Sequence, residues 1–385
     1  MVKRGQTNQR CAVLKRIEFQ QFLDILTARG YRILGPTMRD SAIILDEIRR
    51  VEELPIGWQD VQSAGSYRLK KQQDKALFGY VVGLQSWKRT LLPPEQVLSK
   101  AEKSKSNWRI SGIEPSTDQT AFLGVRPCDL QAIIALDRVF LHGDYVDTHY
   151  QARRKDALVI VVNCAVVGGN CFCTAMGTGP RAIAGFDLAL TEIVDSGSGH
   201  RFFVEIGSDR GAEICREGAL GDATEEDRRQ AEAISSAAAA RIQRIVDTTG
   251  LKEQLSANTE HPRWKEVASR CLTCGNCTMV CPTCFCSTML DDTSLDGSQA
   301  RRLRRWDSCF TMEYSYIHGG SIRYSPQARY RQWLTHKFAT WVDQYGSFGC
   351  VGCGRCITWC PAGIDVTEEI RELRRSRVFE KSSQQ

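Results

Sequence analysis

The sequence predicts an α+β protein, with an N-terminal α/β domain followed by a helical C-terminal domain. Three observations indicate this: strand-like and helix-like segments alternate before residue 220, a polar Ala-rich segment covers 222–256, and two cysteine motifs of identical spacing follow it. A chain of 385 residues is long enough for two or three compact domains. We expect an α/β domain at 1–220, a helical linker at 221–260 and a cysteine-rich helical domain at 261–385.

The first elements belong to the α/β scaffold. Residues 17–50 predict a helix over FQQFLDILTARG, a turn at Gly35-Pro36 and a strand over SAIIL. Residues 65–88 mix β-branched and aromatic residues with regular polar interruptions, which predicts short antiparallel strands.

A βαβ unit is predicted between residues 120 and 185. Its strands are AFLGV and ALVIVV, its helix is DLQAIIALDRVF, and each strand runs into a turn that carries cysteines. Ligands bind at the carboxyl ends of such parallel strands. The turns could therefore bring together four thiolates for a metal cluster, from Cys128, Cys164, Cys171 and Cys173. The alternative is that these are buried apolar cysteines beside a Gly-rich turn.

Two longer helices are predicted beyond the βαβ unit. The linker should form one amphipathic helix over EEDRRQAEAISSAAAARIQRIV, and ARYRQWLTHKFATWVDQYG should form another that ends at Gly346.

The composition favours a reduced, cytoplasmic protein. The N-terminus lacks the apolar stretch of a secretory signal, and the longest apolar run, 157–169, is too short to span a bilayer. Clustered cysteines in a reduced compartment are metal ligands or reactive thiols rather than disulfides, and the odd count of 17 agrees with this. The net charge of +6 and the basic stretch at 301–305 allow a nucleic-acid partner, but a solvated face is the simpler interpretation. We expect no nucleic-acid and no membrane partner.

Two cysteine motifs carry the chemistry. Each has the form C-x2-C-x2-C-x3-C-P, at 271–282 and at 350–361. Three cysteines at this spacing wrap around one [4Fe-4S] cubane, while the fourth, before Pro, ligates the neighbouring cluster. We therefore expect one cluster on Cys271, Cys274, Cys277 and Cys360, and a second on Cys350, Cys353, Cys356 and Cys281. Glycines inside the motifs leave room for close backbone approach: Gly275, Gly352 and Gly354.

Zinc is the competing metal, because CxxC pairs also build tetrahedral sites, and a zinc or nucleic-acid-binding protein is the distant alternative. Zinc would leave two repeats of a four-cysteine run ending in Pro unexplained. The remaining cysteines are less informative. Cys284, Cys286 and Cys309 are small hydrophobes around the clusters or a further metal or redox site, whereas Cys11 and Cys215 look structural.

Motifs of substrate-converting enzymes are missing. The sequence has no P-loop, no GxGxxG in a Rossmann context, no HExxH and no GxSxG. We expect no catalytic residue, and a role limited to electron transfer.

The chain resembles the sulfhydrogenase β-subunit family over nearly its whole length. The resemblance rests on GVRPCDLQAI, NCFCTAMGTGP, CLTCGNCTMVCPTCFC, RWDSCF and CVGCGRCITWCPAGIDVTEEI. This family includes the β subunit of cytosolic NADP-linked [NiFe] hydrogenases and the similar A subunit of anaerobic sulfite reductase. The 68 residues between Cys281 and Cys350, with flanking helices, also resemble the α-helical ferredoxin type of fumarate reductase iron–sulfur subunits.

The resemblance implies a heterotetrameric oxidoreductase complex. Its γ subunit would bind flavin and NAD(P)H, a small δ subunit would carry iron–sulfur clusters, and a large α subunit would hold the nickel–iron site. This chain would pass single electrons between the flavin subunit and the hydrogenase module. The motif cysteines correspond to cluster ligands, and Asp129 or Asp307 could replace one thiolate of the N-terminal set.

Overall fold

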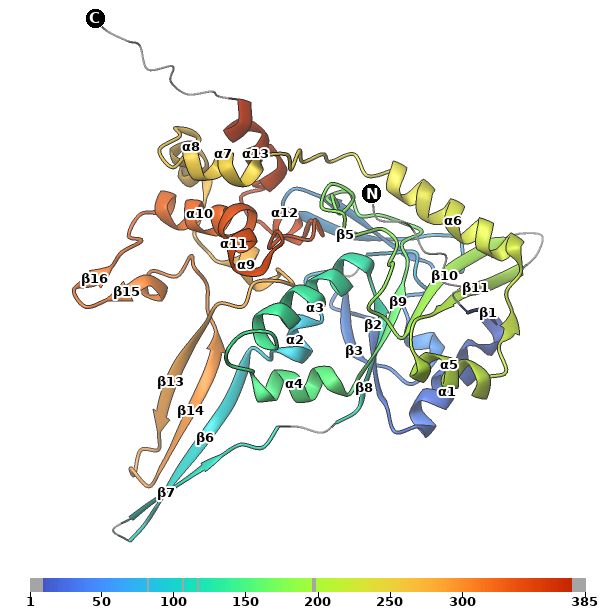
Figure 1. Cartoon of the computed structure of the whole chain (residues 1–385), viewed down its shortest axis with the longest axis horizontal. Coiled ribbons are helices and arrows are strands. Elements are labelled where there is room, and N and C mark those ends of the chain that lie inside the picture. The colour runs from blue at the N-terminus through green and yellow to red at the C-terminus, as the bar shows by residue number, and fades with distance from the viewer. Residues whose placement is uncertain (1–9, 82, 106, 116–117, 196–198, 376–385) are drawn as a thin grey trace, which may run out of the picture.

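A twisted eight-stranded sheet forms the centre of the N-terminal part (Figure 1). The computed structural model describes residues 10–375, except 82, 106, 116–117 and 196–198, so both ends of the predicted domain ranges lie outside it. The strand order is β12-β1-β11-β10-β9-β8-β2-β3, and the four strands from β10 to β2 are parallel. The strands are β1 (Cys11–Lys15), β2 (Arg32–Arg39), β3 (Ala42–Glu47), β8 (Thr120–Val125), β9 (Ala157–Val162), β10 (Leu188–Asp195), β11 (Gly199–Ile206) and β12 (Gly221–Asp222).

Helices cover both faces of this sheet, which explains why β9 is buried at all six positions. Leu158 and Ile160 pack in one core with α1, while Val159 and Val161 pack in another with α3. The N-terminal helices are η1 (Arg16–Glu18), α1 (Phe19–Ala28), η2 (Val51–Glu53), α2 (Lys88–Leu91), α3 (Pro127–Phe140), α4 (Thr148–Lys155), α5 (Asp209–Glu217) and α6 (Glu225–Ala240). The predicted βαβ unit is confirmed, because β8 and β9 are parallel neighbours joined through α3.

A four-stranded arm projects from the body (Figure 1). Its order is β13-β14-β6-β7, and it combines chain segments from both halves of the sequence. The strands are β6 (Glu95–Ser104), β7 (Asn107–Gly112), β13 (Ser287–Thr293) and β14 (Gln299–Trp306). The basic stretch at 301–305 lies on β14, where its arginines pair with acids, as in Arg301–Asp292 at 2.7 Å and Arg302–Asp291 at 2.8 Å.

The C-terminal part is a cluster of short helices around a second core. It contains α7 (Leu251–Ala257), α8 (Arg263–Arg270), α9 (Asn276–Met279), η3 (Glu313–Ser315), α10 (Pro326–Thr335), the π-helical turn η4 (His336–Thr340), α11 (Trp341–Tyr345), α12 (Arg355–Thr358) and α13 (Val366–Arg375). Two small hairpins complete the fold: β4 (Trp58–Ser63) with β5 (Ser66–Lys71), and β15 (Tyr316–Ile317) with β16 (Gly320–Ser321). As predicted, the helical run after 328 ends at Gly346, which is left-handed with φ 70°.

Three sequence predictions need correction. Gly35-Pro36 is not a turn but lies inside β2; Pro36 is tolerated there because β2 pairs with β8 only from Arg32 to Leu34. Of the short strands predicted for 65–88, only β5 is present, and the described residues after it, 72–81 and 83–88, contain no strand. The linker helix ends at Ala240 rather than continuing to 246. Beyond it the chain is held instead by Arg244, which bonds Asp365 at 2.8 Å.

No helix in the described part of the chain is long and apolar enough to cross a membrane.

Candidate metal centres

A first cavity lies between the two cysteine motifs. Three of its five cysteines come from the loop around α9, namely Cys271, Cys274 and Cys277, and the other two, Cys356 and Cys360, come from the second motif. The rest of its wall is largely apolar and includes the rings of Phe310, Tyr330 and Trp333. Toward solvent it is bordered by Cys274, which is exposed, and by Leu272, which is 65% exposed.

The loop that carries the first three cysteines is shaped by left-handed residues. Thr273 has φ 50° and Gly275 has φ 76°, so the chain turns sharply between successive thiols. Thr278 braces the turn, because its hydroxyl donates to the Gly275 carbonyl at 2.7 Å and contacts Ser308 Oγ at 2.7 Å.

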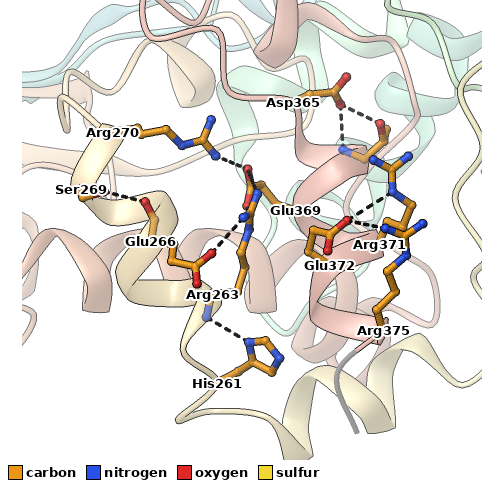
Figure 2. A network of polar contacts seen from close by, with 11 residues as sticks. His261, Arg263, Glu266, Ser269, Arg270, Asp365, Glu369, Arg371, Glu372 and Arg375 are labelled. Carbon is orange, nitrogen blue, oxygen red and sulfur yellow. Dashed lines mark hydrogen bonds and ion pairs between the residues drawn. The ribbon is translucent and has the colours of Figure 1, made fainter. Parts of the chain in front are cut away.

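A buried carboxylate ties α13, which follows Cys360, to two arginines of α8, which precedes Cys271 (Figure 2). The Glu369 side chain is 1% exposed and accepts hydrogen bonds from Arg263 at 2.6 and 3.1 Å and from Arg270 at 2.5 Å. Arg270 directly precedes Cys271 in the sequence, so this network fixes the point at which the first motif begins.

A second cavity repeats the pattern with the motifs exchanged. It is lined by Cys350, Cys353 and Cys356 of the second motif and by Cys281 of the first. Cys356 also lines the first cavity, so the two cavities are adjacent.

The second motif is pressed against the N-terminal part. Gly354 has φ 74°, and a Cβ atom there would lie 2.3 Å from the Asn170 carbonyl oxygen. A Cβ atom at Gly352 would lie 2.6 Å from the Phe172 carbonyl oxygen. These two glycines therefore let the second motif pack closely against the loop that carries Cys171 and Cys173.

Buried cations surround the second cavity. Lys337 Nζ donates to Cys281 Sγ at 3.2 Å and to the Gly349 carbonyl at 3.2 Å. Although burial opposes it, the sulfurs of Cys281 and Cys284 raise the pKa of Lys337, which keeps the ammonium charged. Lys88 lies nearby: its Nζ donates to the Cys284 carbonyl at 3.0 Å and sits 4.0 Å from the Trp306 ring centre.

A buried ion pair joins the second motif to α3. Arg355 donates to the two carboxylate oxygens of Asp129 at 2.6 and 2.9 Å, and both side chains are at most 5% exposed. Both oxygens of Asp129 are thus engaged by Arg355, which argues against its proposed use as a replacement ligand.

The four N-terminal cysteines gather beyond the ends of β8 and β9. Cys164, Cys171 and Cys173 influence one another electrostatically, and Cys173 also acts on Cys128. Burial is the main cause that raises the pKa of each of these thiols, and for Cys173 the pKa reaches about 12. This set also lies close to the second cavity, because Cys353 contributes to the raised pKa of Cys128.

Arg126 supplies a cation beside the N-terminal set. It is 2% exposed, donates through Nη2 to the Phe78 carbonyl at 2.9 Å, and lowers the pKa of Cys164 against the larger effect of burial. A buried guanidinium next to several thiols suits a negatively charged group held among them.

In the described ranges, no three His, Cys, Asp or Glu side chains converge closely enough to hold a single metal ion. The motif thiols are instead spread around the walls of the two cavities. Sequence reasoning located these thiols but missed Lys88, Lys337, Arg126 and Arg355, since no local pattern marks a lysine or arginine that folds back onto a distant motif.

Comparison with known proteins agrees with this geometry. A family model described as 4Fe-4S dicluster domain matches residues 270–364. The chain is also 30% identical, over 364 residues, to sulfhydrogenase 2 subunit beta of Pyrococcus furiosus, covering 92% of this chain and 96% of the relative. The chain belongs to the sulfhydrogenase β-subunit family. The predicted resemblance is thereby confirmed, and the chain is an iron–sulfur electron-transfer subunit with a dicluster domain at its C-terminal end.

Proposed function

We propose that this chain is the electron relay of a cytosolic, NAD(P)-linked [NiFe] hydrogenase complex. The observation that carries the proposal is the sorting of thiols. Each cavity is lined by the first three cysteines of one motif and by the last cysteine of the other, and Cys356 lines both cavities. A cubane takes four such thiolates. The first [4Fe-4S] cluster is assigned to Cys271, Cys274, Cys277 and Cys360, and the second to Cys281, Cys350, Cys353 and Cys356.

A third [4Fe-4S] cluster is assigned to Cys128, Cys164, Cys171 and Cys173. Three of these thiols are buried together, and Arg126 beside Cys164 would balance part of the cluster charge. The alternative is four inert buried thiols, with Asp60 as the anion that interacts with Arg126.

The order of the relay follows from shared neighbours. Cys353 of the second set acts on the N-terminal thiols, and Cys356 lines both cavities of the dicluster domain. The second site therefore lies between the N-terminal site and the first site, and the first site meets the surface at Cys274 and Leu272.

The clusters would accept and release single electrons, and the residues of this chain control how they do so. The rings of Phe310, Tyr330 and Trp333 form an apolar wall of the first site. Lys337 places a positive charge on a sulfur of the second site, which favours its reduced, more negative form.

The partners are proposed from the family. A γ subunit with flavin and NAD(P)H would exchange electrons with this chain, and a small iron–sulfur δ subunit and a large nickel–iron α subunit would form the hydrogenase module. We place the helical ferredoxin type of domain at the C-terminal end.

Iron counting tests the number of clusters. Protein purified anaerobically should be brown and hold about twelve iron atoms per chain, and Cys171→Ser should lower this by about four. Cys215→Ser is the matched control, because this cysteine is buried on α5 away from the sites and should keep all iron. About eight iron atoms per chain in the wild type, with the same number in Cys171→Ser, would rule out the third cluster. A colourless protein that contains zinc would rule out all three clusters.

Isolation of the native complex tests the partners. The chain, tagged in its own organism and purified anaerobically, should bring down subunits containing flavin and nickel. A sirohaem-containing subunit without nickel would instead make it the A subunit of an anaerobic sulfite reductase.

A further inference from the structure

Two cysteines outside the three sets meet at the base of the projecting arm. The last residue pair of the β13–β14 hairpin is Ser287 with Trp306, and the Asp307 N–H then donates to the Cys286 carbonyl at 2.9 Å. This ladder brings Cys286, just before β13, beside Cys309, just after β14. The hairpin therefore holds two thiols together that are 23 positions apart in the sequence.

The two side chains are in direct contact. Cys286 and Cys309 are hydrogen-bonded to each other, and the Tyr314 hydroxyl also bonds Cys286. The hydrogen bond from Cys309 is the main cause that lowers the pKa of Cys286 to about 6, against the opposing effect of burial. A stabilised thiolate next to a second thiol is the arrangement found in redox-active dithiols.

This pair is close to the relay but is not part of it. Neither cysteine lines the first or the second cavity. Cys309 directly precedes Phe310, which lines the first cavity, and it is electrostatically coupled to Cys277. Both thiols keep partial exposure, and the neighbouring Tyr314 is 37% exposed, so a small molecule can reach them.

We propose that Cys286 and Cys309 form a redox-active dithiol that reduces low-molecular-weight disulfides, using electrons from the iron–sulfur relay. The Cys286 thiolate attacks one sulfur of the disulfide, forms a mixed disulfide and releases one small thiolate, which takes up a proton from solvent. Cys309 loses its proton to solvent, attacks the Cys286 sulfur and releases the second small thiolate, which also takes up a proton, and a Cys286–Cys309 disulfide is left. Two electrons taken singly from the relay, with one proton, restore the Cys286 thiolate and the Cys309 thiol. The net change is one disulfide, two electrons and two protons to two thiols.

The last step rests on the proposed relay, so the test separates the two claims. Full-length protein is reduced anaerobically with titanium(III) citrate, freed of excess reductant and mixed with oxidised glutathione. The visible absorbance of the clusters should recover in the wild type and in Cys215→Ser, and should fail to recover in Cys309→Ser. In Cys309→Ser, peptide mapping after alkylation should find glutathione trapped on Cys286.

Recovery in Cys309→Ser at the wild-type rate would overturn the dithiol. So would a loss of iron in Cys286→Ser or Cys309→Ser, since the pair would then be metal ligands. Failure of the relay would give a different result. If the wild-type protein showed no cluster absorbance but peptide mapping still found the Cys286–Cys309 disulfide, the exchange step would stand and the relay would be ruled out as the electron source.

Discussion

The two cavities of the dicluster domain share a cysteine spacing but differ in their surroundings. The first has a largely apolar wall and meets solvent at Leu272 and Cys274. The second is packed against the N-terminal part, and Lys337 donates a hydrogen bond to one of its sulfurs, that of Cys281. Identical ligand motifs therefore do not imply identical clusters, because charge, hydrogen bonds to sulfur and solvent exposure set the reduction potential. We expect the second cluster to have the higher potential.

The largest effect on stability should come from the buried Arg355–Asp129 ion pair, which anchors the second motif to α3. Asp129→Asn leaves the Arg355 charge buried without its counter-charge, which costs roughly 3–5 kcal/mol for a buried pair. The unfolding midpoint in anaerobic urea titrations should fall strongly. Asp291→Asn, at an exposed pair on the arm, should leave the midpoint nearly unchanged. Equal small effects of both substitutions would show that the second motif is not anchored through this pair.

The two motif loops differ in what lies against their glycines. Gly354→Ala places a Cβ atom against the Asn170 carbonyl oxygen, whereas Gly275→Ala meets the more adaptable Ser308 hydroxyl at 3.1 Å. Overpacking costs about 1–3 kcal/mol in addition to the left-handed strain. Gly250→Ala is the control, since it has φ +61° and nothing within 4 Å of the added atom. Thermal unfolding should rank Gly354→Ala as the most damaging. A Gly275→Ala protein less stable than Gly354→Ala would reverse the comparison.

The ammonium group of Lys337 beside the Cys281 sulfur should make the reduction potentials of the two clusters differ. Lys337→Met removes the ammonium from Cys281, and a charged hydrogen bond of about 1.5–3 kcal/mol corresponds to a fall of roughly 60–130 mV in the second potential. The first cluster serves as the internal control in the same EPR-monitored redox titration. A shift shared equally by both clusters would contradict a local effect.

The smallest effect should come from Leu272, at the solvent-exposed border of the first cavity. Leu272→Ala opens the first cavity further to water, which stabilises the more negative reduced cluster and raises its potential slightly. The same redox titration should show a shift smaller than that of Lys337→Met. No stability change beyond the ordinary range of surface substitutions is expected.

The sequence predicts which thiols lie together far better than it predicts their surroundings. Motif spacing alone identifies the eight thiols that line the two cavities, because a cubane would need such local spacing, and the βαβ pattern accounts for the gathering of the N-terminal four. Lys337 and Arg355 could not be predicted in this way, since their partners lie 56 and 226 positions away. Beyond the early end of α6, Arg244 likewise bonds a residue far away in the sequence, Asp365.

Exchange of the fourth cysteine between the motifs is the central claim, and Cys281→Ser tests it most directly. EPR-monitored redox titration of the wild type and Lys337→Met first identifies the second cluster as the one whose potential responds to Lys337. In Cys281→Ser that signal should be lost or altered while the first cluster remains, and Cys360→Ser should show the reverse. Loss of the first cluster alone in Cys281→Ser would contradict the crossed assignment.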